Sequence, residues 1–325
     1  MSRQSLLSRS AEAIFWMARY VERAENIARI LDVNLNLQLD SGQSPVDQWR
    51  PMFEVSGDEE EFDARYPSPT AGSVMRFMTF DSTYRNSIAN CLYVARENGR
   101  TVREIISSEM WEQLNRYYLF VKSANPDKVL KNPSDFYREI RRASHLFEGL
   151  SWSTMSHSEA WNFATLGRMI ERADQTSRIL DVKYFVLLPK AEDVGTPVDD
   201  IQWAAVLKSV SGFEMYRKLY GALAPATIVE FLIMNGEFPR SIVHCLKAAR
   251  EALYTITSTS PDTYRLGSER LLSKLSSDLR YADTREIVIS GLHEYLDRLQ
   301  VRFNEVGEAI HEDFFAPAEL RGGPA

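Results

Sequence analysis

The sequence predicts an all-α protein, a helical bundle built from two tandem, sequence-related halves. Glycine and proline are scarce, with 15 and 13 among 325 residues. The hydrophobic fraction of 44% and the charged fraction of 26% are those of an ordinary globular protein. An all-β design needs more turns than so few glycines and prolines supply, so the composition favours helices. The third observation is an internal repeat.

The repeat consists of two ordered matches. Residues 19–33 (RYVERAENIARILDV) and 168–182 (RMIERADQTSRILDV) agree at nine of fifteen positions, with an offset of 149. At an offset of 154, residues 87–97 align with 241–251, and Gln48-Trp49 aligns with Gln202-Trp203. A short loop insertion explains the change of offset. We interpret the repeat as a tandem duplication with halves 1–155 and 156–315, packed about a pseudo-two-fold axis, and a flexible tail 316–325.

The predicted helices follow from apolar spacing and from boundary residues. In residues 10–39, Ile14, Met17 and Val21 begin a stripe with steps of three or four, typical of one buried helix face. The equivalent helix begins after Ser156 or Ser158 and ends before Pro189. Residues 41–70 are expected to be mostly loop with a short helix. The other predicted helices cover 71–80, 84–106, 108–123, 133–153, 199–222, 225–235, 239–256, 262–280 and 282–312.

The first match places a polar stripe in both copies. On a helix that turns about 100° per residue, its charged and amide side chains fall within an arc of about 120°, roughly opposite the apolar stripe. Each copy holds three guanidinium groups, one carboxylate and one amide. The candidate site residues are Arg19, Glu22, Arg23, Asn26 and Arg29, and in the second copy Arg168, Glu171, Arg172, Gln175 and Arg178.

Three interpretations of these stripes remain open. They form a solvated face, where each exposed pair contributes only about 0.2–0.5 kcal/mol, although such a face does not require the same residue types in both copies. They form a buried network at the crossing of the long helices, with Glu22 and Glu171 bound by arginines of the other half. They form an anion site for phosphate or an acidic peptide. Among arginines, Glu22 is expected to be a poor general acid.

No catalytic or cofactor motif stands out. The five histidines lack a ligand spacing such as HExxH, so no metal site is predicted, and His311-Glu312-Asp313 is interpreted as a solvated polar turn near the frayed end. Phosphate-cradling loops such as G-x-G-x-x-G are absent, so no cofactor is expected. Cys91 and Cys245 occupy equivalent repeat positions in apolar helices and are expected in the core.

Charge and hydropathy argue against two classes of partner. The net charge is -7, and the 38 lysines and arginines are spread along the chain, which disfavours nucleic-acid binding. No run approaches the roughly 18–20 apolar residues of a membrane span. With only two cysteines, a reducing compartment and a cytoplasmic location are expected.

Tyr20-Val21-Glu22-Arg23-Ala24 and Met169-Ile170-Glu171-Arg172-Ala173, each followed by Arg-Ile-Leu-Asp, resemble the bacterial Alpha-E family. The segment Ser107–Asn115 is also similar to that family. The resemblance covers about residues 1–315. It implies an α-helical domain with a Glu-Arg motif whose genes accompany circularly permuted ATP-grasp proteins and transglutaminase-like proteins, in systems that make, modify or degrade peptides.

The resemblance therefore implies a non-catalytic helical partner or scaffold for an ATP-grasp peptide ligase-like enzyme. On this hypothesis the stripes organise the bundle or hold an acidic peptide or enzyme segment. One alternative is an enzyme of the same peptide pathway, with Glu22, Arg23, Glu171 and Arg172 lining a cleft. Another is a simple helical adaptor that dimerises.

Overall fold

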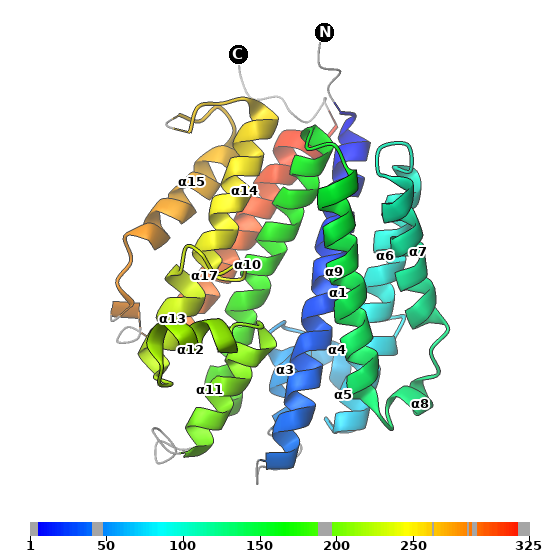
Figure 1. Cartoon of the computed structure of the whole chain (residues 1–325), viewed down its shortest axis with the longest axis vertical. Helices are drawn as coiled ribbons and strands as arrows, with labels where there is room; N and C mark the ends of the chain where they lie inside the picture. The colour runs from blue at the N-terminus through cyan, green and yellow to red at the C-terminus, as the bar shows by residue number, and fades with distance from the viewer. Residues whose placement is uncertain are drawn as a thin grey trace.

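Two long helices, α1 (Ser8–Asp40) and α10 (Glu159–Leu187), pack against each other in the middle of the molecule (Figure 1). This computed structural model describes residues 6–40, 48–187, 197–261, 263–284, 286–287 and 291–317. Within those ranges the chain forms helices and turns and no strand. The prediction of an all-α helical bundle is confirmed.

The two central helices are buried on nearly all sides. The predicted apolar stripe of α1 lies in the core, where Ile14, Met17 and Leu31 are fully buried. On the same helix Glu22 and Glu25 retain only 2% and 0% of their accessible surface. A helix that is buried all round is normally apolar, and buried polar groups need hydrogen-bond partners. The central helices must therefore satisfy each other's polar side chains.

The helices of residues 51–154 lie beside α1 (Figure 1). Of these, α6 and α9 pack on α1, and α7 packs on both α6 and α9. Serine side chains begin two of them, because Ser87 and Ser107 accept hydrogen bonds from backbone N–H groups three residues onward. Their bounds are α3 (Pro51–Glu54), α4 (Glu59–Asp63), α5 (Ala71–Phe80), α6 (Ile88–Thr101), α7 (Ser108–Lys122), α8 (Pro126–Val129) and α9 (Pro133–Thr154).

The helices of residues 197–315 lie on the other side of the central pair, beside α10 (Figure 1). There α14 and α17 pack on α10, and α15 packs on both α14 and α17. The last turn, η2, is π-helical and returns to contact α1. Their bounds are α11 (Pro197–Ser209), α12 (Phe213–Tyr220), α13 (Pro225–Met234), α14 (Ile242–Thr257), α15 (Gly267–Arg280), α17 (Leu292–Ile310) and η2 (His311–Phe315).

Several helix boundaries differ from the prediction for local reasons. The helix predicted over 84–106 begins only at Ile88, because Ser87 is its N-cap. The helix predicted over 199–222 is divided into α11 and α12 at Ser211, whose φ of 55° no α-helix allows. In the predicted helix 282–312, α17 begins only after Gly291, whose φ is 101°. Residues 48–70 hold two short helices, α3 and α4, and 41–47 lie outside the described residues.

The C-terminal polar turn is more ordered than predicted. His311 and Glu312 are exposed, as expected of a solvated turn. Asp313 instead accepts a hydrogen bond from the backbone N–H of Ser268 at 2.8 Å, and Phe315 is buried. The contact with α15 therefore holds η2 in place. Most of the predicted flexible tail, from residue 318 on, lies outside the described residues.

None of the described helices is both long enough and apolar enough to cross a lipid bilayer.

Candidate functional site

The two Glu-Arg dipeptides of the repeat bind each other crosswise where α1 meets α10. Arg172 donates from Nε to Oε1 of Glu22 at 3.0 Å and from Nη2 to Oε2 at 2.8 Å. Arg23 donates from Nε to Oε1 of Glu171 at 2.6 Å and from Nη2 to Oε2 at 3.0 Å. Each carboxylate thus receives a bidentate guanidinium from the other central helix, the strongest form of this ion pair.

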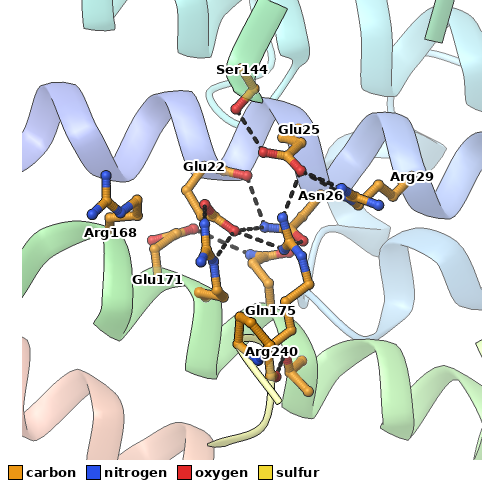
Figure 2. A network of polar contacts seen from close by, with 12 residues as sticks. Glu22, Glu25, Asn26, Arg29, Ser144, Arg168, Glu171, Gln175 and Arg240 are labelled. Carbon is orange, nitrogen blue, oxygen red and sulfur yellow. Dashed lines mark hydrogen bonds and ion pairs between the residues drawn. The ribbon is translucent and has the colours of Figure 1, made fainter. Parts of the chain in front are cut away.

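Amide side chains one turn later complete both carboxylates. Asn26 donates to Oε1 of Glu22 at 3.0 Å, and Gln175 donates to Oε1 of Glu171 at 3.3 Å. Figure 2 shows these side chains pointing toward one another between the two helices. Both glutamates are within 2% of complete burial. The interpretation as an exposed face is therefore excluded for the centre of the stripes.

Of the other predicted arginines, one binds a Glu-Arg glutamate and three bind different acids. Arg19 joins the network through Nε, at 2.9 Å from Oε2 of Glu171. The remaining three do not reach either Glu-Arg glutamate. Arg29 binds Glu25, Arg178 binds Asp174, and Arg168 lies 3.6 Å from Glu148.

Sequence reasoning missed residues that the structure places in the same network. Arg240, just before α14, donates to Glu22 at 2.9 Å, to Asn26 at 3.0 Å and to Glu25 at 2.6 Å. Ser144 on α9 donates to the other oxygen of Glu25 at 2.6 Å (Figure 2). The alignment of Glu25 with Asp174 is a signal that could have identified Glu25. Arg240 lies in a turn, where helical periodicity gives no signal.

The electrostatics keep the buried carboxyl groups ionised. Burial alone would raise the pKa of Glu22, but the guanidinium groups of Arg172 and Arg240 lower it below the usual range. In the same way Arg23 and Arg19 outweigh burial and lower the pKa of Glu171 to about 2. A carboxylate that stays ionised near neutral pH and already accepts three or more hydrogen bonds is a poor general acid or base.

The two cysteines are not nucleophiles in this fold. Cys91 and Cys245 are fully buried, and burial raises the pKa of each thiol to about 12. A thiol with that pKa holds almost no thiolate at neutral pH. The expectation that both are core residues agrees with their burial.

A cluster of possible metal ligands lies between α10 and α17. His293 sits between Asp181 and Asp297, with ring nitrogens 2.8 Å and 3.5 Å from their carboxylates. Burial acts to lower the pKa of His293, but the bond and charge of Asp181 raise it overall. A histidine that bridges two carboxylates as a cation does not need a metal ion, so the geometry fits an ion-pair cluster.

The two crosswise pairs differ in how exposed their arginines are and in the cavities that they border. A cleft of about 1020 Å³ is lined by Arg19 and Arg23, whose side chains are 12% and 19% exposed. Arg172, in the other pair, is only 6% exposed and also donates to Glu148 at 3.0 Å. The Arg23–Glu171 side of the network therefore faces a large cleft, whereas Glu22 of the other pair borders a cavity of about 10 Å³.

A smaller cavity, of about 110 Å³, also borders the Arg23–Glu171 pair. It is lined by Asn86, Asp174 and Gln175, among others. Asp174 binds Arg178 through one oxygen, while its buried Oδ1 contacts no donor in the described structure. Asn86 lies 154 residues before Arg240, so the offset of the repeat places a short amide where the other half has a guanidinium.

Fold and site together define a class: an all-α protein whose two Glu-Arg dipeptides, on neighbouring central helices, neutralise each other inside the bundle. The profile of the Alpha-E family, described as a predicted alpha-helical domain with a conserved ER motif, matches residues 6–315. The chain belongs to the Alpha-E family, as the resemblance of the two motifs indicated.

Curated relatives are longer proteins. An uncharacterized protein of Mycobacterium bovis, Mb2597, is 23% identical over 304 residues, and an uncharacterized protein of Mycobacterium tuberculosis, Rv2567, is 22% identical over 304 residues. Each match covers 84% of this chain and 32% of the relative. The chain thus spans about a third of the length of the curated relatives it matches. No solved structure matches the chain.

Proposed function

We propose that the chain is a duplicated helical unit whose halves are joined about a pseudo-two-fold axis by the crosswise Glu-Arg pairs. The helix bounds support this, because α5 and α6 begin 154 residues before α13 and α14. Ser87 and Ser241 cap α6 and α14 in the same way, each accepting from the N–H three residues onward. Stacked aromatic pairs also correspond: Phe77 with Tyr84, and Phe231 with Phe238.

On this basis we propose a non-catalytic partner or scaffold for an ATP-grasp peptide ligase-like system. The observation that carries the proposal is the state of the two glutamates in the Glu-Arg motifs. Both motif glutamates are buried, ionised and fully bound by arginines, so their role is to hold the bundle together rather than to transfer protons. The chemistry of the system would then belong to another protein.

The longer relatives support a partner role. About two thirds of each lies outside the matched region, so the domain occurs there joined to further chain. By the family resemblance, the proposed partners are an ATP-grasp protein and a transglutaminase-like protein, in the cytoplasm.

Co-purification from the native host tests this proposal. The tagged chain is expected to recover an ATP-grasp protein reproducibly, whereas the same tag on an unrelated helical protein is not. Mass spectrometry of both eluates identifies what is enriched. If repeated purifications under gentle salt conditions enrich no ATP-grasp protein, the partner role is wrong.

The cleft supports the alternative of an enzyme in the same peptide pathway. The cleft has a volume of about 1020 Å³, and Arg19 and Arg23 line it. Both arginines bind Glu171. A test is to incubate the purified chain with ATP and short peptides and to follow phosphate release and new peptide bonds by mass spectrometry. Turnover by the chain alone would replace the partner proposal with this one.

A further inference from the structure

The cleft of about 1020 Å³ is formed by segments that are distant in the sequence. Its walls come from α1, from the start of α6 with the turn before it, and from α17 with η2. Ligand pockets in proteins usually measure about 300–1000 Å³, so the cleft is large enough for a short peptide. What it would bind depends on the charges that line it.

One wall presents guanidinium groups against aromatic rings. Arg19 is held by Glu171 through Nε, while its two terminal nitrogens donate to no group in the described part of the chain. Its guanidinium lies 4.9 Å from the centre of the Trp16 ring, which fixes its plane. Arg85 lines the same cleft and is exposed, without an ion pair to any described residue. A fixed, partly buried guanidinium with free donors binds a carboxylate well.

The facing segments present acids. Glu308 on α17 and Glu312 on η2 line the cleft, and both are exposed. Neither forms an ion pair with Arg19, Arg85 or another residue of the described structure. Opposite charges within reach of each other on a surface normally pair. Here the described arginines and glutamates line one cleft without pairing with each other, which suits a ligand that carries both signs.

From this arrangement we propose that the cleft binds a short peptide with a free carboxylate and a free ammonium group. The carboxylate lies against Arg19 and Arg85, and the ammonium lies against Glu308 and Glu312. Apolar or aromatic side chains of the peptide pack on Trp16 and Tyr20, which lie on the same wall. A polyanion such as a nucleotide is disfavoured, because the two glutamates repel it. The inference does not rest on the partner proposal.

Isothermal titration of the full chain tests the proposal with the tripeptide Gly-Gly-Tyr and two blocked forms. The carboxyl-amidated form lacks the negative end, and the amino-acetylated form lacks the positive end. We expect saturable binding of the free tripeptide, and each blocked form to bind about tenfold more weakly, because one charge-assisted contact is lost.

Variants assign the two ends of the ligand. Arg85→Gln is expected to weaken the free tripeptide about tenfold without further weakening the amidated form. Glu308→Gln is expected to weaken binding of the free tripeptide about tenfold without further weakening binding of the acetylated form. The matched control is Glu104→Gln, an exposed glutamate outside the cleft, which should change nothing. Circular dichroism of all variants shows that the fold is kept.

Three outcomes would overturn the proposal. The free tripeptide fails to saturate the chain up to millimolar concentrations, or Glu308→Gln binds like Glu104→Gln, or inorganic phosphate binds as tightly as the tripeptide. The last outcome would make the cleft a simple anion site. None of them bears on co-purification with an ATP-grasp protein, so the two proposals fail independently.

Discussion

At the scale of single residues, the Glu171 side chain offers the clearest test of how much the crosswise ion pairs stabilise the fold. It is completely buried and receives donors from Arg19, Arg23 and Gln175. Removing one member of a buried ion pair leaves the other charges without compensation, at a cost of about 3–5 kcal/mol. Glu171→Gln is therefore expected to lower the free energy of unfolding by that amount, measured by urea denaturation.

The matched control is Glu61→Gln, since Glu61 pairs with Arg65 on the surface, where its side chain is 45% exposed. That change is expected to cost less than about 0.5 kcal/mol. Equal effects of the two substitutions would mean that the crosswise network does not stabilise the fold.

The loss of stability caused by Glu171→Gln should depend on pH, because the pKa of Glu171 is lowered in the folded chain. Its pKa of about 2 in the folded chain lies below the value of about 4.3 expected when unfolded. Its contribution is therefore complete above about pH 5.5 and is lost as the pH falls toward 2. The stability difference between the natural chain and Glu171→Gln should shrink by about 3 kcal/mol over that range. A difference that stays constant from pH 7 to pH 3 would contradict the assignment.

The repeat makes part of this site predictable and leaves another part out of reach. A residue type kept in both copies at one helical position, such as Glu22 with Glu171, indicates that the pair shares a structural role. Arg240 completes the network from a turn, and its counterpart by offset is Asn86, so no repeated pattern marks it. The position of such a side chain depends on tertiary packing, which a single sequence does not specify.

At the scale of elements, the crossing of α1 and α10 depends on a glycine. A Cβ added to Gly167 would lie 2.5 Å from the carbonyl oxygen of Phe15, a backbone atom that cannot move without shifting α1. Alanine favours helix over glycine by about 1 kcal/mol, but overpacking costs about 1–3 kcal/mol. Gly167→Ala is therefore expected to lower the melting temperature.

Gly149 supplies the control for this prediction. It lies in α9 and is exposed, and a Cβ there would meet nothing within 4 Å. Gly149→Ala should gain up to about 1 kcal/mol from helix propensity alone. If Gly167→Ala raised the melting temperature as Gly149→Ala does, the close approach of the two helices would be refuted.

The helices themselves were predictable where apolar spacing and caps agree. The helix expected over 71–80 matches α5 (Ala71–Phe80), which Thr70 caps together with Ser73. The predictions that failed extended a helix through a backbone turn, as at Ser211 and Gly291. A serine at positive φ is rare, so its presence cannot be expected from the amino-acid type.

At the scale of the whole molecule, each half supplies what neutralises the other. Glu22 on α1 is bound by Arg172 and Arg240, which follow residue 155 in the chain. Glu171 on α10 is bound by Arg19 and Arg23, which precede it. Separating the halves would expose the apolar faces of α1 and α10 and leave both sets of charges unmatched. The two halves should therefore fold together rather than one after the other.

Expression of residues 1–155 and 156–315 as separate chains tests this expectation. Each alone is expected to show weak helical signal and no cooperative melting, because its central helix lacks a partner. Co-expressed, the two should purify as a one-to-one complex that melts cooperatively. The complex should weaken measurably when the second fragment carries Glu171→Gln and stay unchanged when the first carries Glu61→Gln. A monomeric fragment 1–155 with a sharp unfolding transition would show instead that the first half is an independent domain, and that the Glu-Arg pairs only join two finished folds.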